Sequence, residues 1–564
     1  SESALSVLNT DQTLALYAEM PPQSPEGVLT HARALIASGQ KGDGEAELVL
    51  AWRTMPMGSD IQKDYLKQHR DLLGQHHAAR LDRMLWDGHM VSSRQMLSLV
   101  DDGQRALAQA RIALRDMAPG VDNRIEAVPE ELRDSPGLAY GRFVWRDRKD
   151  RDDDAIDLLL ERSTSVQALG EPGKWASRRA KLARQLMRAG KPERAYQVAS
   201  THFMLEGSGF ADLEWVSGFI ALRLLNDPET AIRHFEAFGG AVQSPISKGR
   251  AGYWLGRAHE ARGDSDGAHL AYMAGAEHQT SYYGLLAAER IGRPFDPVLA
   301  NPPSLPNWKD AAFMQSSVLK AGLLALQAGQ LTLAERFLTH LVESLDPVEA
   351  GQLGDMVIEL GQPHLAVMIA KRAARQGRVI PAAYFPVHPL AEKSLPMAAE
   401  MNLAIARRES EFDPTVVSGA GARGLMQVMP GTAISVATDM GVLAAHETSR
   451  LTREWEYNAT LGARYLAGLA GDFGGNVVMI AAGYNAGPGR PIRWMKDFGD
   501  PRTDAVDIVD WVEFIPFNET RNYVMRVTES LPVYRARLGK DPLPLPFSHE
   551  LVGSTLDAFA PQSE

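Results

Sequence analysis

A turn that recurs along the first two thirds of the chain constrains the fold more than any other feature. Each copy has an apolar helix end, then Gly or Asn, four further residues, and an Ala inside the next helix. Gly or Asn suits a left-handed helix cap, and the Pro or Asp that follows suits the start of a new helix. The copies are Gly190 to Ala195, Asn226 to Ala231, Gly263 to Ala268, Gly329 to Ala334 and Gly361 to Ala366.

The turns are spaced by 36, 37, 66 and 32 residues. If the spacing of 66 holds one degenerate unit, the period is that of a helix-turn-helix repeat such as the tetratricopeptide type. Weaker signals of the same kind surround Gly39 and Gly103. The pattern predicts an all-α fold whose N-terminal part is a helical-repeat superhelix with a concave face, and an irregular helical bundle is the alternative.

Two proline-rich stretches divide the rest of the chain. The first runs from Val379 to Pro389 and separates the repeats from a region around Glu409. The second, Asp541 to Pro546, ends the compact part and leaves a draped or mobile tail at 546–564. We therefore expect a separate C-terminal domain at 381–545.

Glu409 is predicted to close a helix. Ser394 and Pro396 suit a cap and a first turn, and no breaker follows before Glu409. One turn back lie Ile405 and Ala406, so partial desolvation and the helix dipole would both raise the pKa of the carboxyl. A raised pKa suits a general acid, although spacing alone favours a solvated or salt-bridged helix-terminal glutamate.

The segment Gly419-Ala-Gly421-Ala-Arg-Gly424 formally matches a dinucleotide-binding GxGxxG motif. Its context does not, because no buried strand precedes it and Pro430 follows within six residues. Glycines here would let the backbone approach a ligand, with amide contacts from Gln427 and an apolar wall from Met429. A tight structural turn with a core methionine explains the pattern equally well.

Two further motifs follow. Tyr484 and Asn485 end an apolar helix among small residues, where the tyrosine could contact a sugar or simply bond a buried carbonyl. Between Glu513 and Val524 two carboxylates and Arg521 mark a turn into a helix. A structural pair between Glu513 and Arg521 is the better interpretation there.

Composition excludes several classes of function. A formal net charge of -11 and a pI near 5.8 argue against a nucleic-acid partner. The absence of cysteine excludes disulfides and thiolate metal sites, and His259-Glu260 lacks a second histidine at zinc-binding spacing, so we expect no metal and no other cofactor. No uninterrupted apolar run is close to the length of about 18 residues that a membrane-spanning helix needs.

These motifs together resemble the catalytic domain of the soluble lytic transglycosylases of bacterial cell walls, which share the goose-type lysozyme core. The order and spacing of five motifs carry the resemblance. The matching pieces are Glu409-Ser410 with Phe412 and Pro414, Gly421 to Ala433, Asn458 with Gly462 and Tyr465-Leu466, Tyr484 to Gly489, and Glu513, Pro516 and Glu519 to Val524. Upstream, Tyr253 to Glu260 and Ser281 to Leu286 look like the helical superhelix of the same family.

The resemblance implies a superhelical domain at 1–310, a linker helical domain at 311–380 that closes it into a ring, and a lysozyme-like, mainly α catalytic domain at 381–545. It makes Glu409 the single acid and base that cleaves the β-1,4 bond between N-acetylmuramic acid and N-acetylglucosamine without water, forming 1,6-anhydromuramoyl ends. Substrate contacts are implied for five residues, and Tyr484 could also orient Glu409. The five are Ser418, Gln427, Met429, Tyr484 and Asn485.

Supporting roles are implied for Ser410, Glu513, Arg521 and Tyr523. Asp413 is expected in a turn, since Pro414 disfavours helical geometry there. Peptidoglycan glycan strands are the expected substrate, with cell-wall synthesis or lysis machinery as a possible partner, and the expected compartment is the periplasm. The chain opens Ser1-Glu-Ser-Ala, which fits a mature secreted chain or a chosen segment of a longer one.

Two alternatives come from other classes. A muramidase-type hydrolase could use the same scaffold and release reducing ends. A non-catalytic helical-repeat scaffold could instead hold partners or glycans on its concave face.

Overall fold

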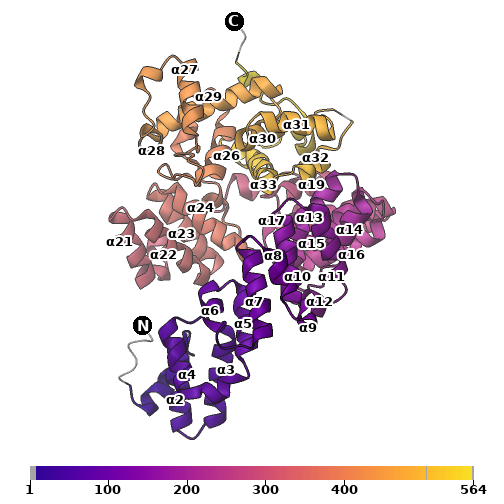
Figure 1. Cartoon of the computed structure of the whole chain (residues 1–564). Coiled ribbons are helices and arrows are strands. Elements are labelled where there is room, and N and C mark those ends of the chain that lie inside the picture. Colours follow the sequence, from indigo (N-terminus) through magenta and orange to yellow (C-terminus); the bar gives the residue numbers. More distant parts are fainter. Residues whose placement is uncertain (1–7, 504, 562–564) are drawn as a thin grey trace. The chain divides into compact units, whose positions relative to one another are not determined.

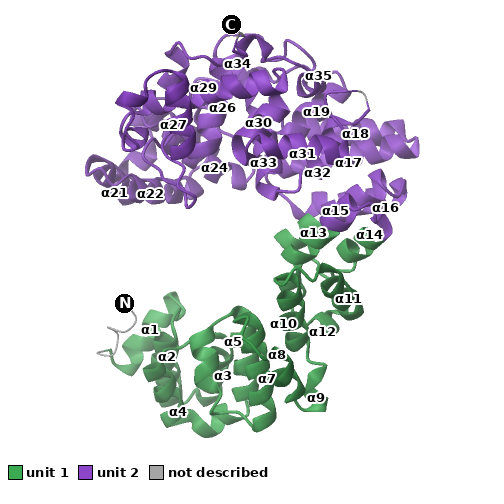
Figure 2. Cartoon of the chain, turned by 45° about the horizontal axis from the view of Figure 1, so that its top comes forward, with its two compact units in different colours: residues 1–183, 194–213 green, residues 184–193, 214–564 purple. Residues whose placement is uncertain are grey.

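The computed structural model describes residues 8–503 and 505–561. It divides into two compact units (Figure 2). Unit 1 comprises residues 1–183 and 194–213, and unit 2 comprises residues 184–193 and 214–564.

Unit 1 is built from helices, which are indigo to purple in Figure 1. Those that lie wholly or partly in it are α1 (Thr10–Glu19), α2 (Pro25–Ala37), α3 (Lys41–Thr54), α4 (Ser59–Gly74), α5 (His77–Asp87), α6 (Met90–Met96), α7 (Asp102–Arg115), α8 (Val121–Glu126), α9 (Glu130–Arg133), α10 (Pro136–Asp147), α11 (Asp152–Arg162), α12 (Val166–Leu169), α13 (Pro172–Arg188), α14 (Pro192–Ser200) and α15 (Ser208–Arg223).

The remaining helices belong to unit 2. Up to residue 392 they are α16 (Pro228–Ala241), α17 (Pro245–Arg262), α18 (Ser265–Ala276), α19 (Tyr282–Arg290), α20 (Pro297–Ala300), η2 (Trp308–Asp310), η3 (Ala312–Gln315), α21 (Ser317–Gln327), α22 (Leu331–Ser344), α23 (Pro347–Glu359), α24 (Pro363–Arg375), α25 (Pro381–Tyr384) and η4 (Pro389–Glu392). Beyond it they are α26 (Ala399–Ser410), α27 (Pro430–Asp439), η5 (Leu443–Ala445), α28 (Arg450–Arg453), α29 (Trp455–Phe473), α30 (Val477–Ala486), α31 (Gly489–Phe498), α32 (Ile508–Phe514), α33 (Asn518–Thr528), α34 (Ser530–Arg537), α35 (Phe547–Val552) and η6 (Asp557–Phe559).

The described residues hold no extended strand, and their only β geometry is a pair of isolated bridges, from Arg423 to Val417 and to Val428. The predicted all-α class is therefore confirmed. Within the same residues no helix combines the length and the apolar character that crossing a membrane requires.

The recurrent turns have the geometry that the sequence predicts. The residues at the predicted caps all have positive φ, and a new helix starts within four residues of each. Their φ angles are 69° at Gly190, 52° at Asn226, 82° at Gly263, 70° at Gly329 and 67° at Gly361. In the long interval a further left-handed glycine, Gly292 with φ 66°, follows the end of α19. The interval thus contains the degenerate unit that the period requires.

The two early signals have different outcomes. Gly39, with φ 90°, separates α2 from α3 as expected. Gly103 does not form a turn, because it lies inside the first turn of α7, whose N-cap is the side chain of Asp101 accepting from the backbone N–H of Gln104. The aspartate, not the glycine, marks that helix start.

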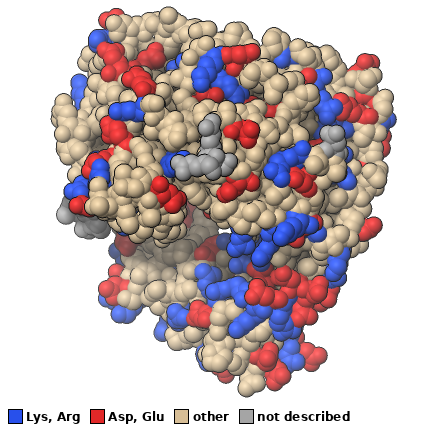
Figure 3. Space-filling view, turned by 90° about the horizontal axis from the view of Figure 1, so that it is seen from above, with Lys and Arg blue, Asp and Glu red and all other residues tan. Residues whose placement is uncertain are grey.

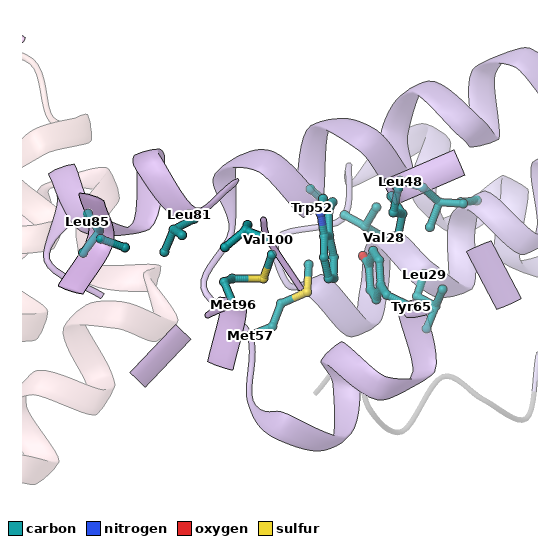
Figure 4. Packing of buried hydrophobic residues seen from close by; sticks show 14 residues of the cluster. Val28, Leu29, Leu48, Trp52, Met57, Tyr65, Leu81, Leu85, Met96 and Val100 are labelled. Atoms are coloured by element: carbon teal, nitrogen blue, oxygen red, sulfur yellow. The ribbon is translucent and has the colours of Figure 1, made fainter. Parts of the chain in front are cut away.

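The core of the N-terminal part of unit 1 is a cluster around Trp52, which is fully buried between Tyr65 and Met57 (Figure 4). The rings of Trp52 and Tyr65 stack with centroids 6.2 Å apart. Arg80 covers the indole face at 4.5 Å and donates to the carbonyl of Met55 at 2.9 Å. A buried guanidinium here satisfies the carbonyl end of α3 while packing on an aromatic ring.

Residues 547–559 are packed, so the predicted end of the compact part near residue 546 is wrong, and of the two predicted forms of the tail, draped or mobile, this segment has the draped one. Phe547, Leu551 and Leu556 are almost completely buried. The Nδ2 of Asn476, the N-cap of α30, donates to the carbonyls of residues 551 to 553. The proline run at 542–546 therefore redirects the chain onto α30 instead of ending the compact structure. The domain boundaries expected at 310, 380 and 545 stay predictions.

Candidate active site

The helix that carries Glu409 is shorter at its start than the sequence predicts. α26 begins at Ala399, and its N-cap, Ala398, makes no side-chain cap bond. Ser394 and Pro396 lie in an irregular segment before it, so the predicted cap is wrong. The Nδ2 of Asn402 donates to the carbonyl of Met397 at 2.9 Å and ties the entering chain to the helix, without capping the helix N–H groups.

Two left-handed residues end the same helix directly after Ser410. Glu411 has φ 48° and Phe412 has φ 66°, which non-glycine residues adopt only when their surroundings hold them. The ring of Phe412 is buried and stacks on His388 with centroids 5.3 Å apart. Lys371 on α24 forms an ion pair with Glu411 at 2.6 Å. This abrupt exit leaves Glu409 in the last turn of the helix.

Among the residues that the structure describes, the side chain of Glu409 has one hydrogen-bond partner. The hydroxyl of Tyr523 on α33 donates to its Oε1 at 2.7 Å. Burial raises the pKa of Glu409 to about 7, and the negative charges of Glu519 and Glu411 add to this. The Tyr523 hydrogen bond and the charge of Arg408 oppose the rise. At neutral pH this carboxyl is partly protonated, which a group that both gives and takes a proton requires.

Tyr523 is itself buried, and burial raises its pKa well above 10. It therefore remains a donor through the physiological range. The sequence motifs pointed to Tyr484 as the residue orienting Glu409, but the hydroxyl of Tyr484 donates to the carbonyl of Met426 at 2.8 Å. Tyr523 makes the bond that Tyr484 was expected to make, because α33 packs against both α26 and α30 (Figure 1).

The glycine-rich loop after α26 folds back on itself. The backbones of Arg423 and Val428 exchange two hydrogen bonds, and Arg423 also pairs with Val417. Ser418 accepts from the backbone N–H of Ala422 through its hydroxyl at 3.0 Å. Gln427 has φ 49° and donates through Nε2 to the carbonyls of Val416 and Gly424. The side-chain Nε2 of Gln427 thus holds the loop, and the side-chain Oε1 can accept a hydrogen bond.

Asn458, on α29, holds the loop in place through hydrogen bonds. It is fully buried, accepts from the backbone N–H of Met426 at 2.8 Å and donates to the carbonyls of Arg423 and Leu451. Gly424 lies against the same carbonyl, because a Cβ there would sit 1.9 Å from the oxygen of Leu451. Ser410 adds a bond from its hydroxyl to the carbonyl of Leu425 at 2.6 Å. The loop is therefore preorganised by buried polar groups.

The other predicted substrate residues border this region. Met429, which precedes α27, is 42% exposed and is the most accessible of the predicted apolar contacts. Asn485, next to Tyr484 on α30, accepts from the hydroxyl of Thr520 at 2.6 Å. The ring of Tyr484 packs against Tyr465 with centroids 5.5 Å apart. Hydrogen bonds connect Glu409 to Tyr523, and they connect Tyr484 and Ser410 to the loop.

Glu513 lies away from these contacts at the centre of a buried ion cluster. Its side chain has no exposure and approaches Arg184 at 3.4 Å and Arg521 at 3.5 Å, and it also pairs with Arg250. The hydroxyl of Tyr283 donates to Oε1 at 2.5 Å. These cations hold the pKa of Glu513 below its usual value against the effect of burial. Such a carboxylate stays ionised and suits a structural role.

The remaining nearby carboxylates have other partners or are exposed. Glu411 pairs with Lys371. Asp413 accepts from the backbone and hydroxyl of Thr415 at 2.8 and 2.7 Å, which is the turn geometry expected before Pro414. Glu519, in the first turn of α33, is exposed. Of these carboxylates, Glu409 alone combines a raised pKa with a hydroxyl donor that fixes its orientation.

The sequence offered no signal for two of these contacts. The Tyr523 bond joins residues 114 positions apart, and only the tyrosine's place in a helix packing on α26 could have indicated it. The contacts of α24 with Glu411 come from Lys371 and from His364, whose Nδ1 lies 3.1 Å from the Glu411 carbonyl oxygen. Both belong to the segment expected as a linker.

Residues 391–506 match the family model described as the transglycosylase SLT domain. The resemblance predicted from the motifs is thereby confirmed for this part of the chain. Among curated proteins, the soluble lytic murein transglycosylase of Escherichia coli strain K12 is 30% identical over 271 residues, which is 47% of this chain and 40% of the relative. The protein of the same name from Salmonella typhimurium is 40% identical over 138 residues, 24% of this chain and 21% of the relative.

The sequence matches thus span less than half the length of these curated relatives. Solved structures match over nearly the whole chain. The lytic transglycosylase Slt of Pseudomonas aeruginosa, solved as an inactive Glu-to-Gln mutant, has a TM-score of 0.67 at 21% identity, with 97% of this chain and 86% of that one covered. The 70-kDa soluble lytic transglycosylase of Escherichia coli has a TM-score of 0.62 at 20% identity, with 96% and 84% covered.

Proposed function

We propose that this chain, which carries a transglycosylase SLT domain and has the fold of the soluble lytic transglycosylases, is a lytic transglycosylase of peptidoglycan. The observation that carries the proposal is Glu409: a carboxyl at the end of a helix, with its pKa raised to about 7 by burial and its orientation fixed by Tyr523. The family match at 391–506 includes this residue.

The first half of the proposed reaction uses Glu409 as an acid. The protonated carboxyl gives its proton to the glycosidic oxygen between N-acetylmuramic acid and N-acetylglucosamine, and the bond from that oxygen to the anomeric carbon breaks. The acetamido group of the substrate stabilises the positive anomeric centre. Tyr523 hydrogen-bonds the carboxylate that remains and limits its basicity.

The second half uses the same group as a base. Glu409 takes the proton of the muramoyl 6-hydroxyl, whose oxygen bonds to the anomeric carbon and forms the 1,6-anhydro ring. No water is consumed, and the carboxyl returns to its protonated state. An ordinary glycosidase uses two carboxylates, so the engagement of Glu411 with Lys371 and of Asp413 with Thr415 supports a one-carboxylate mechanism.

For substrate binding we propose Ser418, Gln427, Met429, Tyr484 and Asn485. The free acceptor of Gln427 and the exposed thioether of Met429 support contacts to sugar hydroxyls and to the ring face. Ser410, Glu513, Arg521 and Tyr523 support the site. We also propose the periplasm as the compartment, because peptidoglycan lies outside the cytoplasm and the curated relatives are named soluble murein enzymes.

The test is the product spectrum of purified cell wall treated with the wild type and with Glu409→Gln. The wild type is expected to release anhydro products one water lighter than the hydrolysed form. Glu409→Gln should keep the helical circular-dichroism spectrum and lose activity by at least about 10³-fold. Near-normal lysis by the variant would reject Glu409, and reducing ends in place of anhydro ends would make the enzyme a hydrolase. That the Pseudomonas aeruginosa relative is inactive as a Glu-to-Gln mutant supports the choice of substitution.

A further inference from the structure

Unit 1 contains a cavity that the proposed chemistry does not use. It measures about 380 Å³ and is lined by residues of α5, α7, α10 and α13 and of the segments that follow α7 and α10. Four arginines line it, and Trp86 and Tyr140 form an aromatic wall with ring centroids 5.1 Å apart. The four are Arg111, Arg115, Arg148 and Arg178.

Two of these guanidinium groups lack an acidic partner. Neither Arg115 nor Arg148 has a carboxylate within 4 Å among the residues that the structure describes, and both are exposed. One guanidinium nitrogen of Arg148 donates to the carbonyl of Arg115 at the end of α7. The acid that lines the cavity, Asp116, already pairs with Arg94 at 2.7 Å.

Arg111 forms the inner end of the cavity and is 8% exposed. Its Cζ lies 5.4 Å from the centre of the Trp86 ring, and its one ion pair is with Asp82, which is 56% exposed. Burial lowers the pKa of Arg111 in spite of that partner. Gly137 makes room for the group, because a Cβ there would meet Cζ at 2.3 Å. A desolvated cation with a single, solvated partner gains from a further anion.

The charges are local to this cavity. The whole chain carries a net charge of -11, and acidic and basic side chains lie intermixed over the face shown in Figure 3. A general field therefore does not attract anions to this protein. Arg178 is neutralised by Asp147 at 3.0 Å, whereas Arg115 and Arg148 leave the cavity rim positive.

We propose that this cavity binds the carboxylates of peptides attached to the glycan substrate. Guanidinium groups match carboxylates in paired N–H···O bonds, and the Trp86–Tyr140 wall suits an alkyl side chain beside them. The volume suits a ligand of a few residues. The inference rests on the proposed function, since cell-wall peptides that are not crosslinked carry free carboxylates on short aliphatic side chains.

A peptide contact on unit 1 would add binding free energy that a glycan without peptides cannot gain. Peptide-bearing wall would therefore be a better substrate than the same glycan without peptides.

The binding test uses the full chain and isothermal titration at low salt. The probe is N-acetyl-L-Ala-γ-D-Glu-meso-diaminopimelate, with the same peptide carrying amides in place of carboxylates as the chemical control. The acid form is expected to bind and the amide form to show no heat. Arg115→Gln with Arg148→Gln should weaken binding about tenfold, and exposed Arg70→Gln on α4 should match the wild type.

The opposite results are equally clear. Unchanged affinity in the double variant, or equal displacement of the peptide by inorganic phosphate at the same concentration, would overturn the proposal, the second by indicating a generic anion site. Because both arginines are exposed, the variants should keep the wild-type melting temperature.

Turnover separates this inference from the proposed function. The ratio of activity on peptide-bearing wall to activity on peptide-free glycan should fall in the double variant and stay at the wild-type value in Arg70→Gln. An unaltered ratio overturns the peptide site while the enzyme remains a transglycosylase. Absence of turnover on both substrates in the wild type would reject the proposed function and leave the titration to decide the cavity.

Discussion

The chemistry of Glu409 is set by its burial, and its pKa near 7 predicts the pH dependence of activity. In the proposed mechanism Glu409 must be protonated when catalysis begins. We therefore expect kcat/KM to be level below pH 7 and to fall about tenfold per pH unit above it. Initial rates on soluble glycan strands between pH 5 and 9 measure this pH dependence. A fall in kcat/KM that begins near pH 4.5 would show that the pKa of the carboxyl is not raised.

Tyr523→Phe tests the hydroxyl that donates to Glu409. That bond lowers the pKa of the carboxyl, so its loss should move the alkaline limb to higher pH while reducing the maximal rate through poorer orientation. Tyr484→Phe is the matched control, since the hydroxyl of Tyr484 donates to Met426 and its removal should leave the limb in place. The same pH profile in all three proteins would exclude the role given to Tyr523.

Glu409 also costs stability at neutral and alkaline pH. Its folded-state pKa lies above the ordinary 4.5, so the native state holds the proton more tightly and stability falls as pH rises from 4.5 through 7. Glu409→Gln should therefore be more stable than the wild type at pH 8, by about 1 to 3 kcal/mol, and equal to it at pH 4. Thermal unfolding at the two pH values checks the sign, and a variant less stable at pH 8 would contradict it.

At this scale the sequence predicted a carboxyl with a raised pKa at the end of a helix, but not all of its surroundings. An apolar helix face one turn before Glu409 was enough to expect a raised pKa. The resemblance implied a supporting role for Tyr523, but its bond to Glu409 and the ion pair of Lys371 with Glu411 could not be predicted, because they depend on how α33 and α24 pack, which neither spacing nor composition encodes.

Among the elements, the loop between α26 and α27 depends most on a single backbone position. Gly424 has φ 74°, and a Cβ would collide with the carbonyl oxygen of Leu451. Gly424→Ala should destabilise the loop by about 2 kcal/mol or more and lower activity through misplacement of Met426 and Gln427. Urea unfolding and activity measure the two effects together.

Gly431→Ala is the control for that change. It lies in the first turn of α27, and nothing stands within 4 Å of the added methyl group. Its stability should stay within about 0.5 kcal/mol of the wild type. Equal losses in both variants would show that the loop tolerates no substitution for reasons other than the Leu451 contact.

The predictability of the helices follows their capping chemistry. Left-handed Gly or Asn after a helix, with Pro or Asp before the next, located the repeat turns because a local steric rule governs them. The start of α26 was misplaced because its N-cap residue, Ala398, has no side chain that can cap the helix and so mark its beginning. Gly103 was wrongly predicted to form a turn between helices. It lies inside α7 because the side chain of Asp101 caps the start of that helix.

Within unit 2, Glu513 joins segments far apart in the sequence. Its partners Arg184, Arg250 and Arg521 lie on α13, α17 and α33. Glu513→Gln would leave these cations around a neutral amide and should cost about 3 to 5 kcal/mol. Hydrogen exchange of α32 in urea measures this loss of stability. The control is the exposed Glu519→Gln, whose stability should stay within about 0.5 kcal/mol of the wild type.

The same cluster predicts acid sensitivity. The cations hold the pKa of Glu513 below 4.5, so its contribution is present above that pH and is lost as pH falls through the lower folded-state value. The difference in stability between the wild type and Glu513→Gln should therefore shrink in acid. A constant difference between pH 3 and 7 would rule out a charge-based role.

For the whole molecule, the sequence predicted the fold class and the helical repeats, because both follow from local periodicity. It did not predict that residues 547–559 pack against α30, since that depends on the Nδ2 of Asn476 donating to carbonyls of the returning chain. Nor did it indicate the arginine-lined cavity of unit 1, whose members come from four helices and follow no linear motif.

The exposed thioether of Met429 gives this cysteine-free chain a point of sensitivity to oxidants. Peroxide converts an accessible methionine into its sulfoxide, which is polar and stiffer, and reductases can reverse the change. Buried methionines such as Met426 are shielded from the same reagent. The glycan-binding surface proposed at Met429 would then lose its pliable apolar side chain under oxidative stress and regain it on repair, without any change to Glu409 itself.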